Sequence, residues 1–471
     1  MLKKTALFLT AALATPATAA TEAEWQVKTR AMFERVIAIP TVLGRSRVPE
    51  MAQYLADQFK AAGWADSDIR IMPHATPGDP KTAALIVHWR AGGKAKAKAK
   101  GIMLMGHMDV VEAKREDSTT DPFVLTERDG YLYGRGTIDM KNGIVAITQA
   151  LIKLRSEGFK PKRDIVVFFS GDEETNGRSA ELGATEWKGI IGPLDFGLNA
   201  DAGGGGYLAD GKPLGFGLQA AEKTYADYTL KVVNRGGHSS KPRADNAIYQ
   251  LATALKRIEA HRFEPVFNEV TRGYFTARAK TATGPLGDAM RAWLANPADG
   301  KAADFIEADP TEAGLTRTRC VATQLFGGHA PNALPQLATA NVNCRIMPGI
   351  APAAIEAELE RVIADPGVAV DQPVPSQQSD PSPLRADVIG AHTRAVLARH
   401  PGMSITPEMS AGATDARPFR SAGIPVYGVN GVWLRVPDDL RAHGKDERLP
   451  VKALHDNVAH WAQLVTELAG K

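Results

Sequence analysis

The sequence predicts an α/β fold: a main domain built on a mixed, mostly parallel sheet, with a smaller α+β domain inserted into it. Apolar strand-like runs alternate with helix-like segments between residues 81 and 198, which is typical of a sheet covered on both faces. From about residue 219 polar and apolar residues alternate instead, and the first pattern returns near residue 350. We therefore expect the main domain at 21–218 and 349–471, and the inserted domain at 219–348.

The first elements of the main domain are read from side-chain spacing. Helical spacing covers residues 24–37 and 49–63, and apolar strands cover 83–89 and 101–106. The charged stretch between these two strands predicts a solvated hairpin tip. A helix follows from Lys141, and two further apolar strands are expected at 165–169 and 194–198.

The later elements belong to the inserted domain and the chain end. Strands are expected at 225–233 and 338–347, with a helix at 246–260 between them. The stretch 262–311 looks irregular apart from one short helix near 288–295. A final helix is expected at 451–468.

Composition and charge exclude several classes of protein. The 471 residues are 44% hydrophobic and 23% charged, which excludes collagen, coiled coil, disulfide scaffold and wholesale disorder. The formal charge of +3 falls to +1 once residues 1–20, with Lys3 and Lys4, are set aside. So small a charge predicts no nucleic acid partner.

The first twenty residues have the layout of a secretory signal peptide. Two lysines precede an apolar run over residues 6–14, and Ala17-Thr18-Ala19 offers a cleavage site of small residues. The run is too short for the roughly 20 residues that span a bilayer. We expect a secreted or periplasmic protein without stable membrane insertion.

The two cysteines become informative if the protein is exported, because oxidising compartments allow disulfides. Cys320 and Cys344 flank Asn332 symmetrically in strand-like segments. If those strands pair around a loop near Asn332, the thiols face one another. A disulfide and two buried free thiols are both compatible with the sequence.

Five short motifs place histidine or carboxylate directly after apolar runs or before a helix. They are His107-Met108-Asp109, the stretch around Asp139, the triplet Asp172-Glu173-Glu174, Asn199-Ala200-Asp201, and the stretch around His443. Singly, each has an ordinary explanation: a surface pair, a helix N-cap, a solvated loop or a structural histidine. In an α/β sheet, however, loops beyond the carboxyl ends of strands converge on one crevice.

Taken together, these side chains predict a metal centre. Two histidines with several carboxylates suit borderline metals such as Zn²⁺, with Co²⁺ or Mn²⁺ as alternatives. One carboxylate that bridges two metals gives each of them three protein ligands. One member of the acidic pair then stays free to act as a base toward water.

The motifs also resemble those of a known family. GHMDVV, GRGTIDMKNG, FFSGDEETNG, NADAG and AHGKDE resemble, in order and spacing, the aminoacylase/carboxypeptidase family of co-catalytic zinc metallopeptidases. That family includes glutamate carboxypeptidase, acetylornithine deacetylase, succinyl-diaminopimelate desuccinylase, carnosinase and Gly-X carboxypeptidase. The resemblance covers residues 24–471 and implies a zinc-peptidase-like catalytic domain with an inserted lid and dimerisation domain.

The resemblance implies a role for each motif residue. His107, Asp139 and Asp201 would hold one of two Zn²⁺ ions per subunit. Asp139, Glu174 and His443 would hold the other, with Asp139 as the bridge. Glu173 would be the general base for a water held between the ions, and Asp109 would orient His107. A cis peptide bond between Asp139 and Met140 is implied as well.

The resemblance also assigns residues of the lid. His238, in NRGGHSS, would stabilise the reaction's oxyanion, often in the partner subunit's active site. Asn332 and Arg345 match positions that hold the substrate's carboxylate, and arginine suits that task because its planar fork pairs with carboxylates. A homodimer through the lid is therefore possible. The loop around Ala413 departs from the family, which usually has glycine there.

The resulting expectation is an exported metal-dependent amide hydrolase. We expect an exopeptidase, a carboxypeptidase or a dipeptidase, acting on short peptides. The alternatives are an N-acyl-amino-acid deacylase and, more remotely, a non-catalytic periplasmic binding protein. The last would lack a ligand or the base, whereas all of them are present here. Arginines 243, 317, 319 and 345 hint at acidic or carboxylate-terminated substrates.

Overall fold

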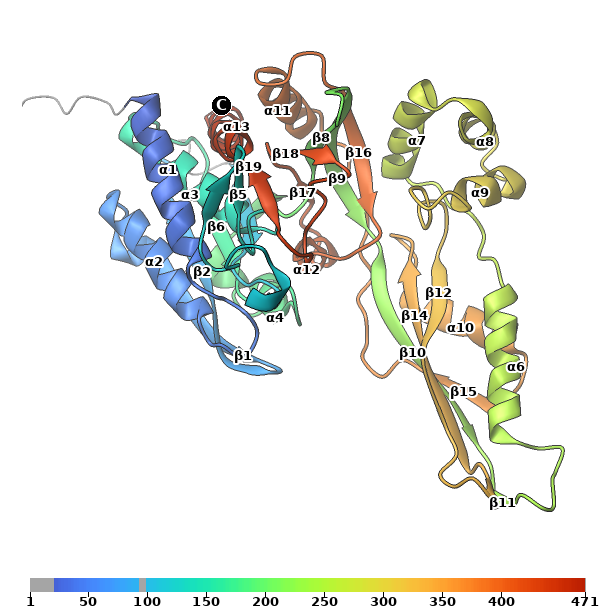
Figure 1. Cartoon of the computed structure of the whole chain (residues 1–471). Helices are drawn as coiled ribbons and strands as arrows, with labels where there is room; N and C mark the ends of the chain where they lie inside the picture. Colours follow the sequence, from blue (N-terminus) through green and yellow to red (C-terminus); the bar gives the residue numbers. More distant parts are fainter. Residues whose placement is uncertain (1–20, 93–98, 471) are drawn as a thin grey trace, which may run out of the picture.

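The protein consists of a wide sheet flanked by helices and a second, narrower sheet that extends to one side (Figure 1). The structure is a computed structural model that describes residues 21–92 and 99–470. The expected signal peptide, residues 1–20, and most of the charged stretch between the strands at 83–89 and 101–106 lie outside the described residues. No helix among those described combines the length and apolar character of a membrane span.

The wide sheet has ten strands of mixed direction, which agrees with the predicted fold class. Their order is β1 (Ile69–Thr76), β2 (Asp79–Trp89), β6 (Ile165–Ser170), β3 (Gly101–His107), β7 (Leu194–Asn199), β17 (Val426–Gly428), β9 (Pro213–Glu222), β8 (Gly204–Leu208) and β18 (Trp433–Val436), and β16 (Ile405–Ser410) pairs with β9. The central strands β6, β3, β7 and β17 run parallel to one another. Their apolar sequences follow from this position, because both faces are buried.

Helices cover both faces of this sheet and close two apolar cores. One face carries α1 (Glu22–Ile37), α2 (Val48–Ala61), α3 (Lys141–Ser156), α11 (Ala386–Leu397) and α13 (Val451–Ala469). The other carries α4 (Arg178–Ala184), α5 (Lys188–Ile191) and α12 (Ala416–Ser421). A small sheet of β4 (Thr126–Arg128), β5 (Tyr131–Tyr133) and β19 (Arg448–Pro450) lies at the edge of the domain.

The predicted hairpin between the strands at 83–89 and 101–106 is wrong. β2 pairs with β1 and β6, and β3 pairs with β6 and β7, so β6 lies between the two predicted partners. An apolar strand buried on both faces accepts any neighbour of similar character. Its pairing is therefore decided by the complete sheet and not by the nearest strand in sequence.

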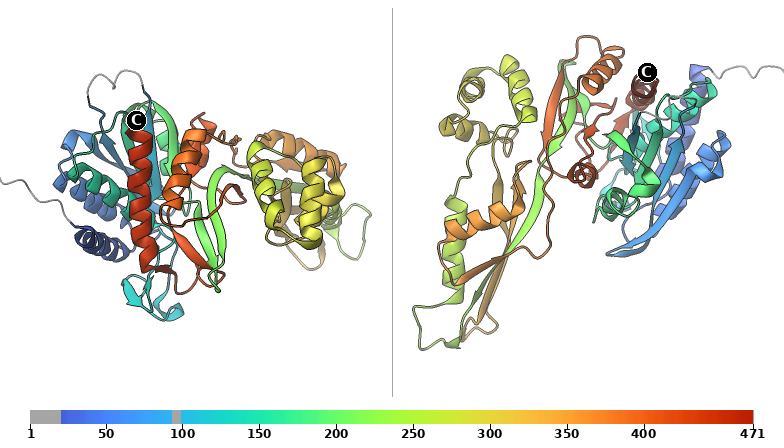
Figure 2. Two further views of the ribbon diagram at one scale, coloured as in Figure 1. Left: turned by 90° about the horizontal axis from the view of Figure 1, so that it is seen from above. Right: turned by 180° about the vertical axis from the view of Figure 1, so that it is seen from behind.

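The second sheet forms most of the inserted domain. Its order is β12 (Arg319–Gly327), β14 (Leu337–Ile346), β10 (Thr224–Val233) and β15 (Val368–Asp371), and α6 (Ala247–Ala260) and α10 (Pro352–Ile363) cover one face. A two-stranded ribbon of β11 (Gly237–His238) and β13 (Ala333–Leu334) lies at its far end (Figure 1). In both views of Figure 2 this module stands to one side of the wide sheet.

The inserted domain has different bounds from those expected. β9 stays in the wide sheet as far as Glu222, so the second sheet begins with β10 and not at residue 219. At the other end, α10 and β15 pack in the second domain's core, beyond the predicted boundary at 348. Helical spacing alone did not show which sheet α10 would cover.

The stretch 262–311 is helical and not irregular. It forms α7 (Glu269–Thr281), α8 (Gly284–Ala295) and α9 (Gly300–Glu307) around a small core centred on Trp293. Only α8 corresponds to the predicted short helix. Asn268 and Asp299 cap α7 and α9 through side-chain oxygens, as helix N-caps commonly do.

The two cysteines form a disulfide. Cys320 and Cys344 lie directly opposite one another in the antiparallel pair β12/β14, around the loop that contains Asn332. Of the two possibilities that the sequence left open, the structure shows the bonded one.

Candidate metal centre

The five predicted motifs meet at the carboxyl ends of the central strands. His107 ends β3, Glu173 and Glu174 follow β6, and Asp201 follows β7. These three strands are parallel neighbours, so their following loops come together. Asp139 precedes α3, and His443 arrives on the loop between β18 and β19.

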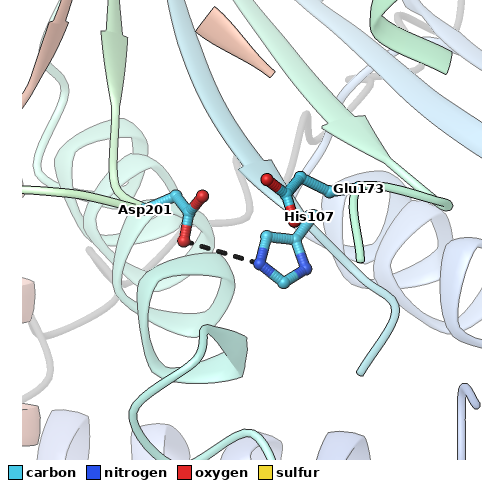
Figure 3. Close-up of side chains that lie close together, drawn as sticks. All are labelled: His107, Glu173 and Asp201. Carbon is cyan, nitrogen blue, oxygen red and sulfur yellow. Dashed lines mark ion pairs between the residues drawn. The ribbon is translucent and has the colours of Figure 1, made fainter. Parts of the chain in front are cut away.

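His107 lies at the centre of the first half of the site. Its Nε2 atom is 3.1 Å from Asp139 Oδ1 and 3.5 Å from Asp201 Oδ1. Figure 3 shows the Glu173 carboxylate beside the same imidazole, with Asp201 on the other side. Ligand atoms of His107, Glu173 and Asp201 lie within 4.8 Å of one another, a spacing that suits a metal ion.

His443 completes the second half of the site. Its Nε2 atom is 3.0 Å from Asp139 Oδ2 and 3.0 Å from Glu174 Oε2. Asp139 therefore presents one oxygen to each histidine, which is the arrangement of a bridging carboxylate. The Asp139–Met140 peptide bond is cis, as the family resemblance implied.

Asp109 connects His107 to the loop that carries the two glutamates. His107 Nδ1 is 3.0 Å from the Asp109 carbonyl oxygen and 3.4 Å from its carboxylate. The carboxylate accepts hydrogen bonds from the backbone N–H groups of Glu173 and Glu174, at 3.2 and 3.0 Å. Asp109 is thus placed to fix the tautomer of the imidazole, and it also holds the acidic pair.

A buried ion pair behind the ligands was missed from the sequence. Glu447 pairs with Arg135 at 2.6 Å and accepts hydrogen bonds from the backbone N–H groups of Gly136, Ile138 and Asp139. It therefore holds the Asp139 loop from behind. The signal was present, because Arg135 and Glu447 are opposite charges inside two of the five motifs.

The site holds several buried carboxylates and few positive charges, and the pKa values of these carboxylates are shifted as a result. Burial, with Asp201 nearby, raises the pKa of Glu173 well above its usual range, and burial raises the pKa of Glu174 to about 7. Burial also raises the pKa of Asp201. The pKa of Asp139 is lowered, because hydrogen bonds from His107 and His443 outweigh its burial.

The residues present fit a pair of divalent cations. Imidazole nitrogens and carboxylate oxygens are the ligands that zinc takes in catalytic sites, and they converge here on two neighbouring positions. Cations at these positions would also offset the negative charge of the carboxylates that share this buried site. The donor set is equally open to Co²⁺ and Mn²⁺.

The predicted lid residues lie apart from this cluster within one chain. His238 is exposed in β11 at the far end of the inserted domain, with its Nδ1 2.8 Å from Ser240 Oγ. Asn332 lies beside it, accepting from Ser239 N–H at 3.0 Å. Arg345 lies near the opposite end of β14, where its guanidinium covers the Tyr225 ring at 4.7 Å. Roughly 27 Å of extended strand separates Arg345 from the Asn332 loop, so one chain cannot close both on one carboxylate.

The other lid arginines have intramolecular partners. Arg317 pairs with Asp304 at 2.8 Å and Arg319 with Glu307 at 2.8 Å, which ties the second sheet to α9. Arg243 pairs with Asp245. These contacts explain the arginines as structural.

Comparisons with known proteins agree with this geometry. The model of the peptidase family M20/M25/M40 matches residues 103–467. A probable carboxypeptidase S-like 2 of Dictyostelium discoideum is 29% identical over 401 residues, which cover 81% of this chain and 74% of the relative. The human N-fatty-acyl-amino acid synthase/hydrolase PM20D1 is 29% identical over 379 residues, covering 77% of this chain and 73% of the relative.

Solved structures share the fold. Human carnosine dipeptidase 1 superposes with a TM-score of 0.60 at 17% identity and covers 96% of this chain and 98% of its own. The M20 family metallo-carboxypeptidase Sso-CP2 of Sulfolobus solfataricus gives 0.65 at 15% identity, with 93% and 98% covered.

The fold and the clustered donor set together define a metal-dependent hydrolase with an α/β catalytic domain. The family match extends over most of the chain and includes all five motifs. The chain belongs to the peptidase family M20/M25/M40. It is an enzyme, a metallopeptidase of that family.

Proposed function

We propose that this protein is an exported exopeptidase that uses two zinc ions to hydrolyse short peptides. The observation that carries the proposal is Asp139, whose two oxygens face His107 and His443 separately. That geometry provides two adjacent cation positions with a base beside them. Two cations there would polarise the scissile carbonyl and lower the pKa of a water between them.

The chain's own residues supply the proton transfers. The Glu173 carboxylate lies beside His107 and Asp201, where it is placed to act as a general base that accepts a proton from water and then returns it to the departing amine. Asp109 keeps Glu173 in place through its backbone N–H, while His107 receives the orienting contacts already described. Glu174 and Asp201 stay with the metal positions and take no part in proton transfer.

The test is a digestion of a defined peptide mixture, followed by mass spectrometry. The zinc-loaded protein should remove residues from one end only, and the identity of that end decides between carboxypeptidase and aminopeptidase-like trimming. Chelation should abolish trimming, and added Zn²⁺ should restore it. Internal cleavage, or trimming that survives chelation, would refute the proposal.

A second candidate is hydrolysis of N-acyl amino acids. It is favoured by the match to PM20D1, named as a synthase/hydrolase of N-fatty-acyl amino acids. Including N-acetyl and N-fatty-acyl amino acids in the same digestion distinguishes the two candidates.

We also propose a homodimer through the inserted domain. β12 is the edge strand of its sheet, and Val321, Leu325 and Phe326 on it are each at least 60% exposed. A long apolar edge strand of this kind is a site for pairing with another chain. A second copy would also bring His238 and Asn332 toward a site that they do not reach within their own chain.

Export is the remaining part of the proposal and rests on residues 1–20. Expression of the full sequence should yield a mature protein that begins near Thr21 outside the cytoplasm. A protein that keeps Met1 and stays in the cytoplasm would remove this part and leave the catalytic proposal untouched.

A further inference from the structure

Two cavities lie beside the metal centre and share part of their lining. The first has a volume of about 370 Å³ and is lined by Asp201 together with residues of β16 and of α7. The second, of about 330 Å³, extends along β8, β9 and β18 and begins next to Ile138, the neighbour of Asp139. Gly203 and Glu408 line both, so the two cavities adjoin at these residues.

Glu408 is a partly buried carboxylate without a partner among the described residues. It lies on β16, and no hydrogen bond or ion pair within the described chain reaches its side chain. Burial raises the pKa of the Glu408 carboxyl to about 7, with no cation nearby to oppose the shift. A carboxylate that is partly removed from water and has no partner in its own chain favours a cationic group in the cavity that it lines.

Glycines on the neighbouring strands leave space for this carboxylate. Gly217 on the neighbouring strand β9 faces it, and a Cβ atom there would collide with the Glu408 carboxylate. At Gly206 a Cβ would come within 3.2 Å of Val436 and 3.3 Å of Leu214, two side chains that line the second cavity. The glycines of β8 and β9 therefore keep the cavity open.

The lining of both cavities gives them a negative and apolar character. No lysine, arginine or histidine is among the described residues that line either cavity, and the charged ones are Asp201 and Glu408. Most other side chains of the second cavity are apolar, with Leu214 and Leu440 half or more exposed at its mouth. A substrate's carboxylate would be repelled here, whereas a cation attached to an apolar body would be attracted.

We propose that Glu408 binds a cationic group of the substrate beside Asp201, while an apolar part of the same residue occupies the second cavity. This inference rests on the proposed peptidase function and narrows its substrate class to short peptides with a free terminal ammonium or a basic first side chain. Such substrates differ from N-acyl amino acids, which carry no positive charge on the acyl side.

The test compares three matched dipeptides with the zinc-loaded enzyme. The first is leucyl-glycine, the second its N-acetyl form, and the third N-acetyl-lysyl-glycine, which moves the positive charge to the side chain. The wild-type enzyme should prefer a cationic substrate to acetyl-leucyl-glycine by at least about tenfold in kcat/KM. Glu408→Gln should reduce that preference by about tenfold or more, and Glu360→Gln, the same change on the exposed face of α10, should not.

A binding measurement keeps the inference independent of catalysis. Calorimetry on the metal-free protein should show that leucinamide binds more weakly to Glu408→Gln than to wild type, and that N-acetyl-leucinamide does not discriminate between them.

The outcomes separate the two proposals. If N-acetyl-lysyl-glycine is cleaved better than acetyl-leucyl-glycine, the basic side chain is the cation that Glu408 accepts. Hydrolysis of acetyl-leucyl-glycine or of a fatty-acyl amino acid that equals or exceeds hydrolysis of both cationic peptides would overturn the inference, as would an equal loss with all substrates in Glu408→Gln. If the wild-type enzyme cleaves no peptide but the amide still binds through Glu408, the proposed function fails and the cation site stands.

Discussion

Asp139 shows how much depends on single side chains in this site. It faces both histidines, its backbone is held by Glu447, and its pKa is lowered by its two hydrogen bonds. By contrast, Glu173 is close to His107 and Asp201 but makes its hydrogen bond to Asp109 through its backbone. Glu174, which makes the same kind of backbone contact to Asp109, differs from Glu173 in facing His443 at 3.0 Å, and this difference supports the proposed roles of Glu174 as ligand and Glu173 as base.

Substitution of Glu173 tests that assignment. Glu173→Gln keeps the size of the side chain but cannot accept a proton, so kcat should fall by about 10²–10⁴-fold. The zinc content, measured by plasma mass spectrometry, should stay at two ions per chain. Glu116→Gln, in an exposed turn of 3-10 helix at Arg115–Asp117, is the matched control. Loss of zinc would show that Glu173 is a ligand, and near-normal turnover would show that it is not the base.

The residues that the sequence predicted are those in motifs with their own local signal. His107, Glu173, Glu174 and Asp201 each follow an apolar strand, and strand ends converge by topology. Glu408 has no such signal, because it is one charge in a short strand that also contains Pro407. Its significance lies in the absence of a partner, which only the assembled cavities reveal.

At the scale of elements, local patterns predicted the strands but not their neighbours. The strands at β3, β6 and β7 follow from continuous apolar runs. The place of β6 between β2 and β3 depends on contacts distant in sequence. The helices α7 and α9 were missed, although Asn268 and Asp299 offered cap signals, because their apolar positions are few.

The disulfide between β12 and β14 should stabilise the inserted domain. It closes a loop with a sequence separation of 24 residues, for which the loss of chain entropy in the unfolded state is worth about 3 kcal/mol. The double variant Cys320→Ala with Cys344→Ala should therefore unfold at lower urea concentration, measured by tyrosine and tryptophan fluorescence. An unchanged midpoint under non-reducing conditions would contradict this.

The helices α11 and α13 contain a buried histidine pair that predicts a pH dependence. His392 Nδ1 is 3.2 Å from His460 Nε2, and His392 Nε2 is 3.1 Å from the Gly217 carbonyl oxygen. Burial lowers the pKa of His392 to about 4 and that of His460 well below 6.5, with Arg399 and His400 adding to the effect on His460. Both histidines are therefore neutral in the folded protein.

Acidification should destabilise the fold through this pair. Between pH 6.5 and 4 the unfolded chain binds protons that the folded one does not, so the free energy of unfolding falls as pH falls. Each histidine contributes about 1.4 kcal/mol per pH unit. Urea unfolding at pH 7, 6 and 5, with chelator present, should show a shallower dependence for His392→Gln than for wild type. Parallel pH profiles would exclude the pair as the cause.

At the scale of the whole molecule, the inserted domain is one long segment of the chain between two parts of the catalytic domain. The inserted domain begins after Glu222, and its own core closes with β15. In the proposed dimer, His238 at its far end would reach an active site only in the other chain. The proposed catalytic role of His238 therefore depends on the oligomeric state of the protein.

The dimer proposal predicts a simple response to charge. Val321→Lys combined with Leu325→Lys on β12 should give a monomer by light scattering, since like charges on two paired edge strands repel. If His238 acts in the partner's site, kcat/KM should fall by about 10²-fold or more in this variant, together with the loss of dimerisation. Lys231→Glu, on an interior strand of the same sheet, is a control for altered charge. A wild-type protein that is monomeric at micromolar concentration would refute the dimer.

The two histidines of the metal centre stand 336 positions apart, at 107 and 443. A chain still being synthesised has therefore made its base and its first ligands long before the last one emerges from the ribosome. Until the segment after β18 folds back, no partial product holds a complete pair of cation positions. We therefore expect a nascent chain to lack a complete metal centre until that last segment has folded.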